Sequence, residues 1–238
     1  MKLPYLVLAF LVFCCGHVYS QKVEILKKSD TFQRKKKSRE IVYWSNTADT
    51  SGLEYVATIS STAVAMESKA LSRLCALAVH RGMKSGANTF MFHSYTDTDS
   101  TRPALTLDFF FADDSALQRN TDREEKNVVY IFGNNGKAMP LQINGKDVTI
   151  PADSFLRYET TFGTALNISK GGSFGASIGN IQAAVGKPAL YYAVSGFGLG
   201  GMVPPPGSIG ISFTTGRITP MDPHFARMLM DMQKQRKY

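Results

Sequence analysis

The spacing of apolar residues changes near residue 62, and this change restricts the fold more than any other feature of the chain. Residues 54–60 alternate between apolar and polar side chains, which is typical of a half-buried strand. Beyond them the spacing becomes that of one helical face, through Leu71, Leu74, Cys75 and Ala78. Gly86 is expected to end this helix. The first half is therefore predicted to be a β-α-β-β domain over 41–112, with its other strands at 41–44, 88–95 and 104–112.

The second half predicts strands almost throughout. Its clearest signal is Asn144-Gly145, a pair that favours a two-residue turn, inside a predicted hairpin at 141–150. The other strands are expected at 128–132, 155–161, 165–169, 189–194 and 209–214. Helical spacing returns in the segment 222–233, through Phe225, Met228, Leu229 and Met232. The fold class is therefore predicted as α+β: the β-α-β-β domain, then a small antiparallel β-sandwich with a C-terminal helix.

The segment 113–126 is rich in charged and amide residues and poor in apolar ones. It is predicted to be a charged linker, so that 41–112 and 127–238 fold as separate units. Asp114-Ser115-Ala116 within it resembles the acceptor pattern for O-linked glycans on exported Bacteroidetes proteins. That resemblance makes Ser115 a candidate modification site.

Residues 1–20 have the three regions of a secretory signal peptide: Lys2, an apolar run, and a short polar stretch with small residues at its end. The apolar run is too short to span a bilayer, and no later run in the chain is long enough. Cleavage is expected after Ser20. Lipidation of Cys14 or Cys15 is the alternative, which Phe13 disfavours because a lipoprotein signal has a small residue there.

The segment 21–40 is strongly basic and contains few apolar residues. It is predicted to be a disordered arm that is attracted to anionic surfaces, namely lipid headgroups, lipopolysaccharide or acidic glycans. A purely solubilising tether is the alternative. Nucleic acid is not expected as a partner, because an exported protein seldom meets it. The candidate surface-binding residues are Lys27, Lys28, Arg34, Lys35, Lys36, Lys37 and Arg39.

No catalytic residue, metal ligand or cofactor is predicted. Residues 175–179 match the pattern of a nucleophile elbow around Ser177, but no buried strand precedes them. The only acids after Ser177 are Asp222 and Asp231, and the only histidine, His224, is two residues from Asp222. The glycines of 196–201 are followed by Pro204-Pro205-Pro206 where a dinucleotide site needs a helix. Cys75 is expected to be a small buried hydrophobic residue. An exposed apolar loop is expected instead, with Phe197, Leu199, Met202 and Val203 at its tip.

Two stretches resemble known bacterial domains. Gly86-Ala87-Asn88, which ends the predicted helix, is similar to the helix stop of small bacterial envelope domains, over residues 54–112. Ile143-Asn144-Gly145-Lys146, Tyr158 and Gly186-Lys187-Pro188 resemble the PEGA-like β-sandwich domain of envelope proteins, over 127–194. These resemblances imply an exported Bacteroidetes-type envelope protein with an accessory role.

The function predicted is therefore that of a non-catalytic, exported cell-envelope protein. It would act as a binding or accessory module, at an anionic envelope surface or on another envelope protein. The expected location is the periplasm, the outer membrane or the medium. The alternative is a hydrolase acting on an envelope polymer, which would need a histidine beside Ser177 or beside a pair of carboxylates.

Overall fold

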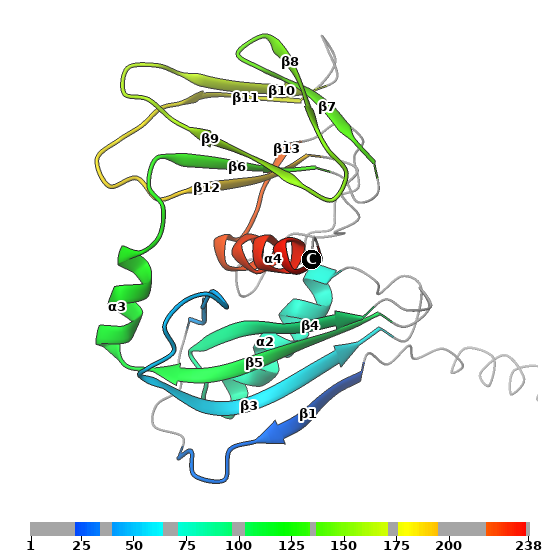
Figure 1. Cartoon of the computed structure of the whole chain (residues 1–238), viewed down its shortest axis with the longest axis vertical. Coiled ribbons are helices and arrows are strands. Elements are labelled where there is room, and N and C mark those ends of the chain that lie inside the picture. The colour runs from blue at the N-terminus through cyan, green and yellow to red at the C-terminus, as the bar shows by residue number, and fades with distance from the viewer. Residues whose placement is uncertain are drawn as a thin grey trace, which may run out of the picture.

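The computed structural model describes residues 22–33, 40–63, 71–96, 103–133, 137–170, 176–194 and 218–236. The protein is mixed α+β and strands dominate it. Figure 1 shows two four-stranded sheets, then helix α4, then a five-stranded sheet with helix α2 behind it. Two hydrophobic clusters fill the space between these layers.

The five-stranded sheet is built by the first half of the chain in the order β1-β3-β5-β4-β2. The pair β2–β4 is parallel, and the other neighbours are antiparallel. Helix α2, Leu71–Ser85, packs mainly on β3 and β5 through the apolar face that the sequence predicted. The strands are β1 (Lys22–Lys28), β2 (Val42–Tyr43), β3 (Leu53–Thr62), β4 (Thr89–Thr96) and β5 (Ala104–Ala112).

The helix α2 ends at the glycine that the sequence indicated. Gly86 has a φ of 103°, which favours glycine, and its N–H donates to Met83 O. Asn88 then joins the start of β4 to the end of β5. Its side chain donates to Ala112 O and accepts from Ala112 N, both at 2.7 Å. The asparagine therefore aligns two strands rather than forming a turn.

The start of the basic segment differs from the sequence prediction, because residues 22–28 form the edge strand β1 instead of a disordered arm. β1 pairs with β3 along its length. Val23 and Ile25 pack against the core cluster, which offsets the entropy lost on ordering the strand. Only three apolar residues, Val23, Ile25 and the exposed Leu26, mark this strand among charged residues, too weak a pattern to separate it from a solvated arm. Residues 34–39 lie outside the described residues.

The predicted linker at 113–126 also differs, because it contains helix α3, Asp114–Asp122. Asp113 caps this helix by accepting from Ala116 N at 2.7 Å. Ala116 is buried with Trp44 and Ala112 at the end of the five-stranded sheet. The sequence signal was hidden because a short polar helix with one buried stripe resembles a linker in composition.

The second half builds two four-stranded sheets, in the orders β11-β10-β7-β8 and β13-β12-β6-β9. Their facing side chains form a separate hydrophobic cluster. The hairpin predicted at Asn144-Gly145 is confirmed: both residues have positive φ, and Ile143 pairs with Lys146. The strands are β6 (Val128–Phe132), β7 (Met139–Ile143), β8 (Lys146–Ile150), β9 (Phe155–Glu159), β10 (Leu166–Lys170), β11 (Ala176–Ile181), β12 (Leu190–Val194) and β13 (Ile218–Pro220).

One strand pair corrects the expected all-antiparallel arrangement. β12 pairs with β6 in parallel, from Leu190–Val129 to Ala193–Phe132. Between these two strands the chain forms the other four-stranded sheet. β12 then runs in the same direction as β6. No local pattern in either strand could have indicated this pairing.

Helix α4, Pro223–Arg236, lies between the two halves (Figure 1). The helix was predicted, and Phe225, Met228, Leu229 and Met232 are buried as its spacing indicated. It packs on β4 and β2 of the first half and on β12 of the second. One hydrophobic cluster therefore contains buried residues from both halves. The buried residues of α4 belong to this cluster, together with those of α2 and the five-stranded sheet. Whether the two units unfold separately stays a prediction.

Candidate functional site

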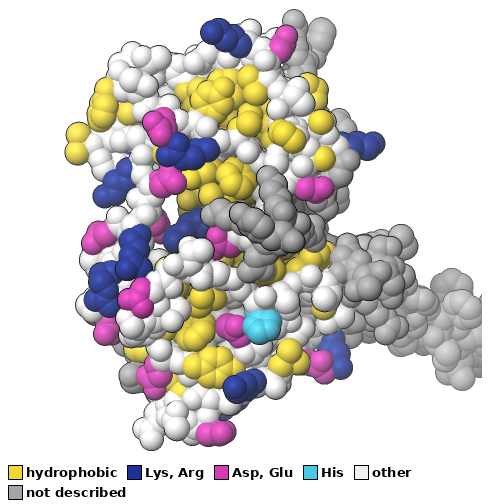
Figure 2. Space-filling view, viewed as in Figure 1, with side chains coloured by type: hydrophobic (Ala, Val, Ile, Leu, Met, Phe, Trp, Pro, Cys, Tyr) yellow, Lys and Arg dark blue, Asp and Glu magenta, His cyan; other side chains and the backbone are white. Residues whose placement is uncertain are grey.

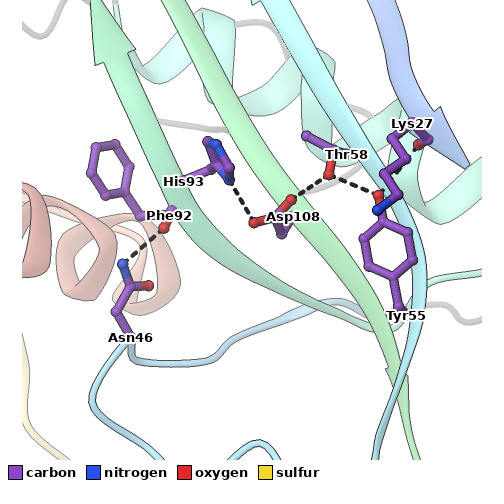
Figure 3. A network of polar contacts seen from close by, with 7 residues as sticks. All are labelled: Lys27, Asn46, Tyr55, Thr58, Phe92, His93 and Asp108. Atoms are coloured by element: carbon purple, nitrogen blue, oxygen red, sulfur yellow. Dashed lines mark hydrogen bonds and ion pairs between the residues drawn. The ribbon is translucent and has the colours of Figure 1, made fainter.

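The polar side chains of the five-stranded sheet form a network on the face that the helices leave open (Figure 3). Leu107 and Phe109 are buried on the helix side, so Asp108 between them points to the open face. His93 Nδ1 lies 2.8 Å from Asp108 Oδ2. On its other side Asp108 accepts from the Thr58 hydroxyl. The network thus joins three neighbouring strands, β4, β5 and β3.

The network continues toward the edge of the sheet. Thr58 Oγ1 lies 2.8 Å from the Tyr55 hydroxyl, and Lys27 Nζ lies 5.6 Å from the centroid of the Tyr55 ring. An ammonium at this distance is attracted by the ring face. Lys27 is thereby held on the open face of β1.

A β-bulge places His93 in this network. The pairing of β4 with β5 shifts between Phe92 and Ser94, so His93 is the extra residue of β4. A bulge redirects the side chain of its extra residue, and here the imidazole turns toward Asp108 (Figure 3). No motif in the sequence links His93 to Asp108, because their contact depends on how β4 and β5 pair. The sequence alone therefore does not predict the pair.

In the His93–Asp108 pair, Asp108 could orient His93 as a general base. When neutral His93 donates from Nδ1 to Asp108, Nε2 carries the lone pair. The His93 side chain is 52% exposed on the surface of β4. The Thr58 hydroxyl contacts Asp108 on the side opposite His93 (Figure 3). A serine-type hydrolase also needs a hydroxyl near Nε2 and a cleft for its substrate. The described network supplies a base and its orienting acid.

A second polar cluster fastens α4 to β2. Asp231, on α4, is buried and its Oδ2 accepts from the Tyr43 hydroxyl at 2.9 Å, from the Ser45 hydroxyl at 2.7 Å and from Asn46 N at 3.2 Å. Burial, and then the nearby Asp231, raise the pKa of Tyr43 well above its usual range. The phenol therefore stays protonated and remains a donor. This cluster is structural, since its polar atoms are directed at one another.

His224 and Asp222 lie close in sequence but have separate structural roles. His224 Nδ1 accepts from Tyr43 N at 3.3 Å, and burial lowers the pKa of this imidazole. Asp222 caps α4 by accepting from Phe225 N at 2.8 Å. Both residues thus fix the start of α4.

Of the site residues predicted from the sequence, the described ones, Lys27, Lys28 and Ser115, are not brought together. Lys27 and Lys28 follow each other on β1 and point to opposite faces of the sheet: Lys27 toward Tyr55, and Lys28 on the side of its buried partner Ala57. Ser115 lies in the first turn of α3, where its hydroxyl donates to Asp113 at 2.7 Å and accepts from Arg119. The candidates outside the described residues are Arg34, Lys35, Lys36, Lys37, Arg39, Phe197, Leu199, Met202 and Val203.

Two further sequence features take structural positions. Ser177 lies on β11, an edge strand, and not on a turn between a strand and a helix. Cys75 is buried, with Sγ 3.8 Å from Met228 Sδ on α4. Burial strongly raises the pKa of this thiol, which suppresses the reactive thiolate.

A shallow open depression of about 260 Å³ lies where α3 meets β6, lined by Glu125, Arg157, Glu159 and other residues. Arg157 forms ion pairs with Glu125 and with Glu159, both at 2.7 Å. With Lys126, which also lines the depression, two cations face two carboxylates, so the depression attracts neither sign of ligand strongly.

The wider comparisons add no family to these observations. No family model, curated protein or solved structure matches this chain. Within the described ranges, no three His, Cys, Asp or Glu side chains converge as a metal site would require. The same ranges contain no helix with the length and apolar character needed to cross a membrane.

Proposed function

We propose that this protein is a non-catalytic, exported module of the cell envelope that binds an anionic surface through its basic segment. The periplasm, the outer membrane and the medium are the locations that an export signal allows. The resemblance of 127–194 to PEGA-like domains favours the same accessory role. The finer description of the α+β fold, as a β-α-β-β unit followed by a β-sandwich, is part of this proposal.

The observation that supports the proposal most is where the basic segment is attached. β1 fixes its beginning, and Phe32 packs on Phe111 of β5 at 6.3 Å between ring centroids. Val42 fixes its end by donating to Asn88 O. The described residues on both sides of 34–39 are therefore attached to the five-stranded sheet.

Export predicts a mature chain that begins at Gln21. The charge, the apolar run and the small residues at Val18 and Ser20 are the features that signal peptidase recognises. Mass spectrometry of the protein recovered from outside the cytoplasm should show the loss of residues 1–20. A mass that includes these residues, or a diacylglycerol on Cys14 or Cys15, would contradict the prediction.

Surface binding predicts a strong effect of the five cations at 34–39. Replacing Arg34, Lys35, Lys36, Lys37 and Arg39 by glutamine should weaken co-sedimentation with phosphatidylglycerol-containing vesicles by about tenfold or more at low salt. Each near-surface cation contributes up to about 1 kcal/mol, and about 1.4 kcal/mol is a factor of ten. Substitution is the right change, because deleting 21–40 would also remove β1 and so destabilise the sheet.

The control replaces three exposed lysines of the second half, Lys126, Lys137 and Lys146, by glutamine, and we call it the distal control. It should bind like the unaltered protein. Equal binding by the unaltered and the 34–39 variants, or binding that ignores salt, would show that the segment is only a tether.

The His93–Asp108 pair favours a second candidate, a hydrolase acting on an envelope polymer. The Nε2 atom of His93 would take a proton from an attacking water. Release of soluble fragments from purified envelope polymer, lost on His93→Gln, would favour this alternative. Vesicle binding that survives the same substitution would keep the two activities separate.

A further inference from the structure

The charged side chains on the outer face of α2 are all basic. Arg73, His80, Arg81 and Lys84 are exposed, and the helix contains no acidic residue. Their spacings of three, four, seven and eight residues place them on one side of the helix. We call these four residues the α2 stripe. From Arg73 to Lys84 it extends for about 16 Å, at 1.5 Å per residue.

The packing of α2 forces this stripe outward. The opposite side of the helix is buried against the sheet, through Leu74, Cys75, Ala78 and Gly82. Among the described residues, none of the cations Arg73, Arg81 and Lys84 forms an ion pair. Their mutual repulsion is therefore not compensated within the described protein.

The stripe contains arginines but no tyrosine, tryptophan or phenylalanine, the aromatic side chains that anchor a protein–protein contact. Such interfaces centre on buried aromatic residues and arginine, and leucine is under-represented among their strongest contacts. The apolar side chain in the middle of the stripe is Leu77, which is half-buried, and Val79 and Met83 are half-buried along the sides of the helix. A row of unpaired cations around one leucine complements a surface of distributed negative charge. The headgroup region of a membrane is such a surface, and it also admits an apolar side chain.

The charge on the opposite face is different. Figure 2, which views the molecule from the side opposite α2, shows Lys and Arg mixed with Asp and Glu over the described residues. The helix side is also the one to which Lys28 points. The end of α2 lies beside the start of β2, because Val42 N donates to Asn88 O directly after the helix. The stripe therefore ends near the point where the chain enters β2 after the basic segment.

We propose that the α2 stripe is the face that meets the phosphate headgroups of an anionic membrane, with α2 lying flat on the surface. This inference rests on the proposed function and adds to it the side of the protein that faces the lipid. The basic segment and the α2 stripe then act together, and the open face with His93 points away from the membrane.

The test uses the full mature chain with Arg73→Gln, Arg81→Gln and Lys84→Gln combined, beside the distal control, which removes the same charge elsewhere. Both are sedimented with vesicles of phosphatidylglycerol and phosphatidylcholine, and of phosphatidylcholine alone. The stripe variant should bind the anionic vesicles about tenfold more weakly or worse, since it loses three near-surface cations. The distal control should bind normally. The three changed side chains are exposed, so the thermal unfolding of the stripe variant should match that of the unaltered chain.

The outcomes separate this inference from the proposed function. A stripe variant that binds normally, while the 34–39 variant does not, would overturn the inference and leave the proposed function intact. If the distal control loses as much binding as the stripe variant, total charge decides binding and the inference is wrong. An unaltered chain that binds neither anionic vesicles nor soluble dextran sulfate contradicts both proposals. Binding to soluble dextran sulfate but not to vesicles would overturn the membrane as the partner.

Discussion

Replacing Asp231 by alanine should lower the free energy of unfolding by about 3 kcal/mol or more. The Tyr43 hydroxyl, the Ser45 hydroxyl and Asn46 N all donate to its Oδ2. A buried donor left without a partner costs about 1–3 kcal/mol, and Tyr43 is fully buried. Because α4 lies between both halves, loosening it should affect the whole fold. Urea unfolding followed by circular dichroism measures the effect.

Three variants test whether the hydrogen bonds to the Asp231 carboxylate cause this loss of stability. Asp231→Asn keeps an acceptor oxygen and should lose less stability than Asp231→Ala. Tyr43→Phe should cost little once Asp231 is already alanine, because the hydroxyl then has no acceptor to lose. Asp147→Ala, on an exposed hairpin, should change stability by no more than about 0.5 kcal/mol. Equal effects of Asp231→Ala and Asp147→Ala would show that the carboxylate does not hold α4.

Replacing Gly82 by alanine should destabilise the protein by about 1–3 kcal/mol, the usual cost of overpacking a core. A Cβ at this position would lie 2.1 Å from Phe109 Cδ1, far inside contact distance. Phe109 is fully buried and stacks on Phe90, so its ring has little room to move. In an exposed helix the same change would stabilise by about 1 kcal/mol, so the sign of the effect is diagnostic.

Further variants separate packing from helix propensity. Gly82→Ala combined with Phe109→Leu should lose less stability than the two single changes added together, because the smaller side chain leaves room for the methyl group. The matched control is the exposed neighbour Arg81, where Arg81→Ala should be more stable than Arg81→Gly by about 1 kcal/mol from propensity alone. At residue 82 the order of alanine and glycine should be reversed. A stabilised Gly82→Ala protein would show that α2 does not lie this close to β5.

The candidate sites differ in how far the sequence could have indicated them. The α2 stripe was available to sequence reasoning, because Arg73, Arg81 and Lys84 follow the same helical spacing as the buried face. It was missed because the denser cations before residue 40 give the stronger compositional signal. The His93–Asp108 pair was not available, since it depends on the register in which β4 pairs with β5. That register is a contact between strands, which the pattern within one strand does not give.

The sequence by itself determined the elements whose periodicity is strong. These include α2 and its end at Gly86, the hairpin at Asn144-Gly145 and the helix α4. In each case the signal is local: one buried stripe, or a backbone conformation that glycine and asparagine adopt readily.

Only the tertiary structure decided which elements meet. It ordered β1 through pairing with β3, paired β12 in parallel with β6, and placed α4 on the sheet of the first half. These arrangements depend on contacts between residues far apart in the chain. Their free energy comes from apolar surface that is buried between elements. The apolar pattern of one element indicates that it has a buried face, but it does not indicate which partner covers that face.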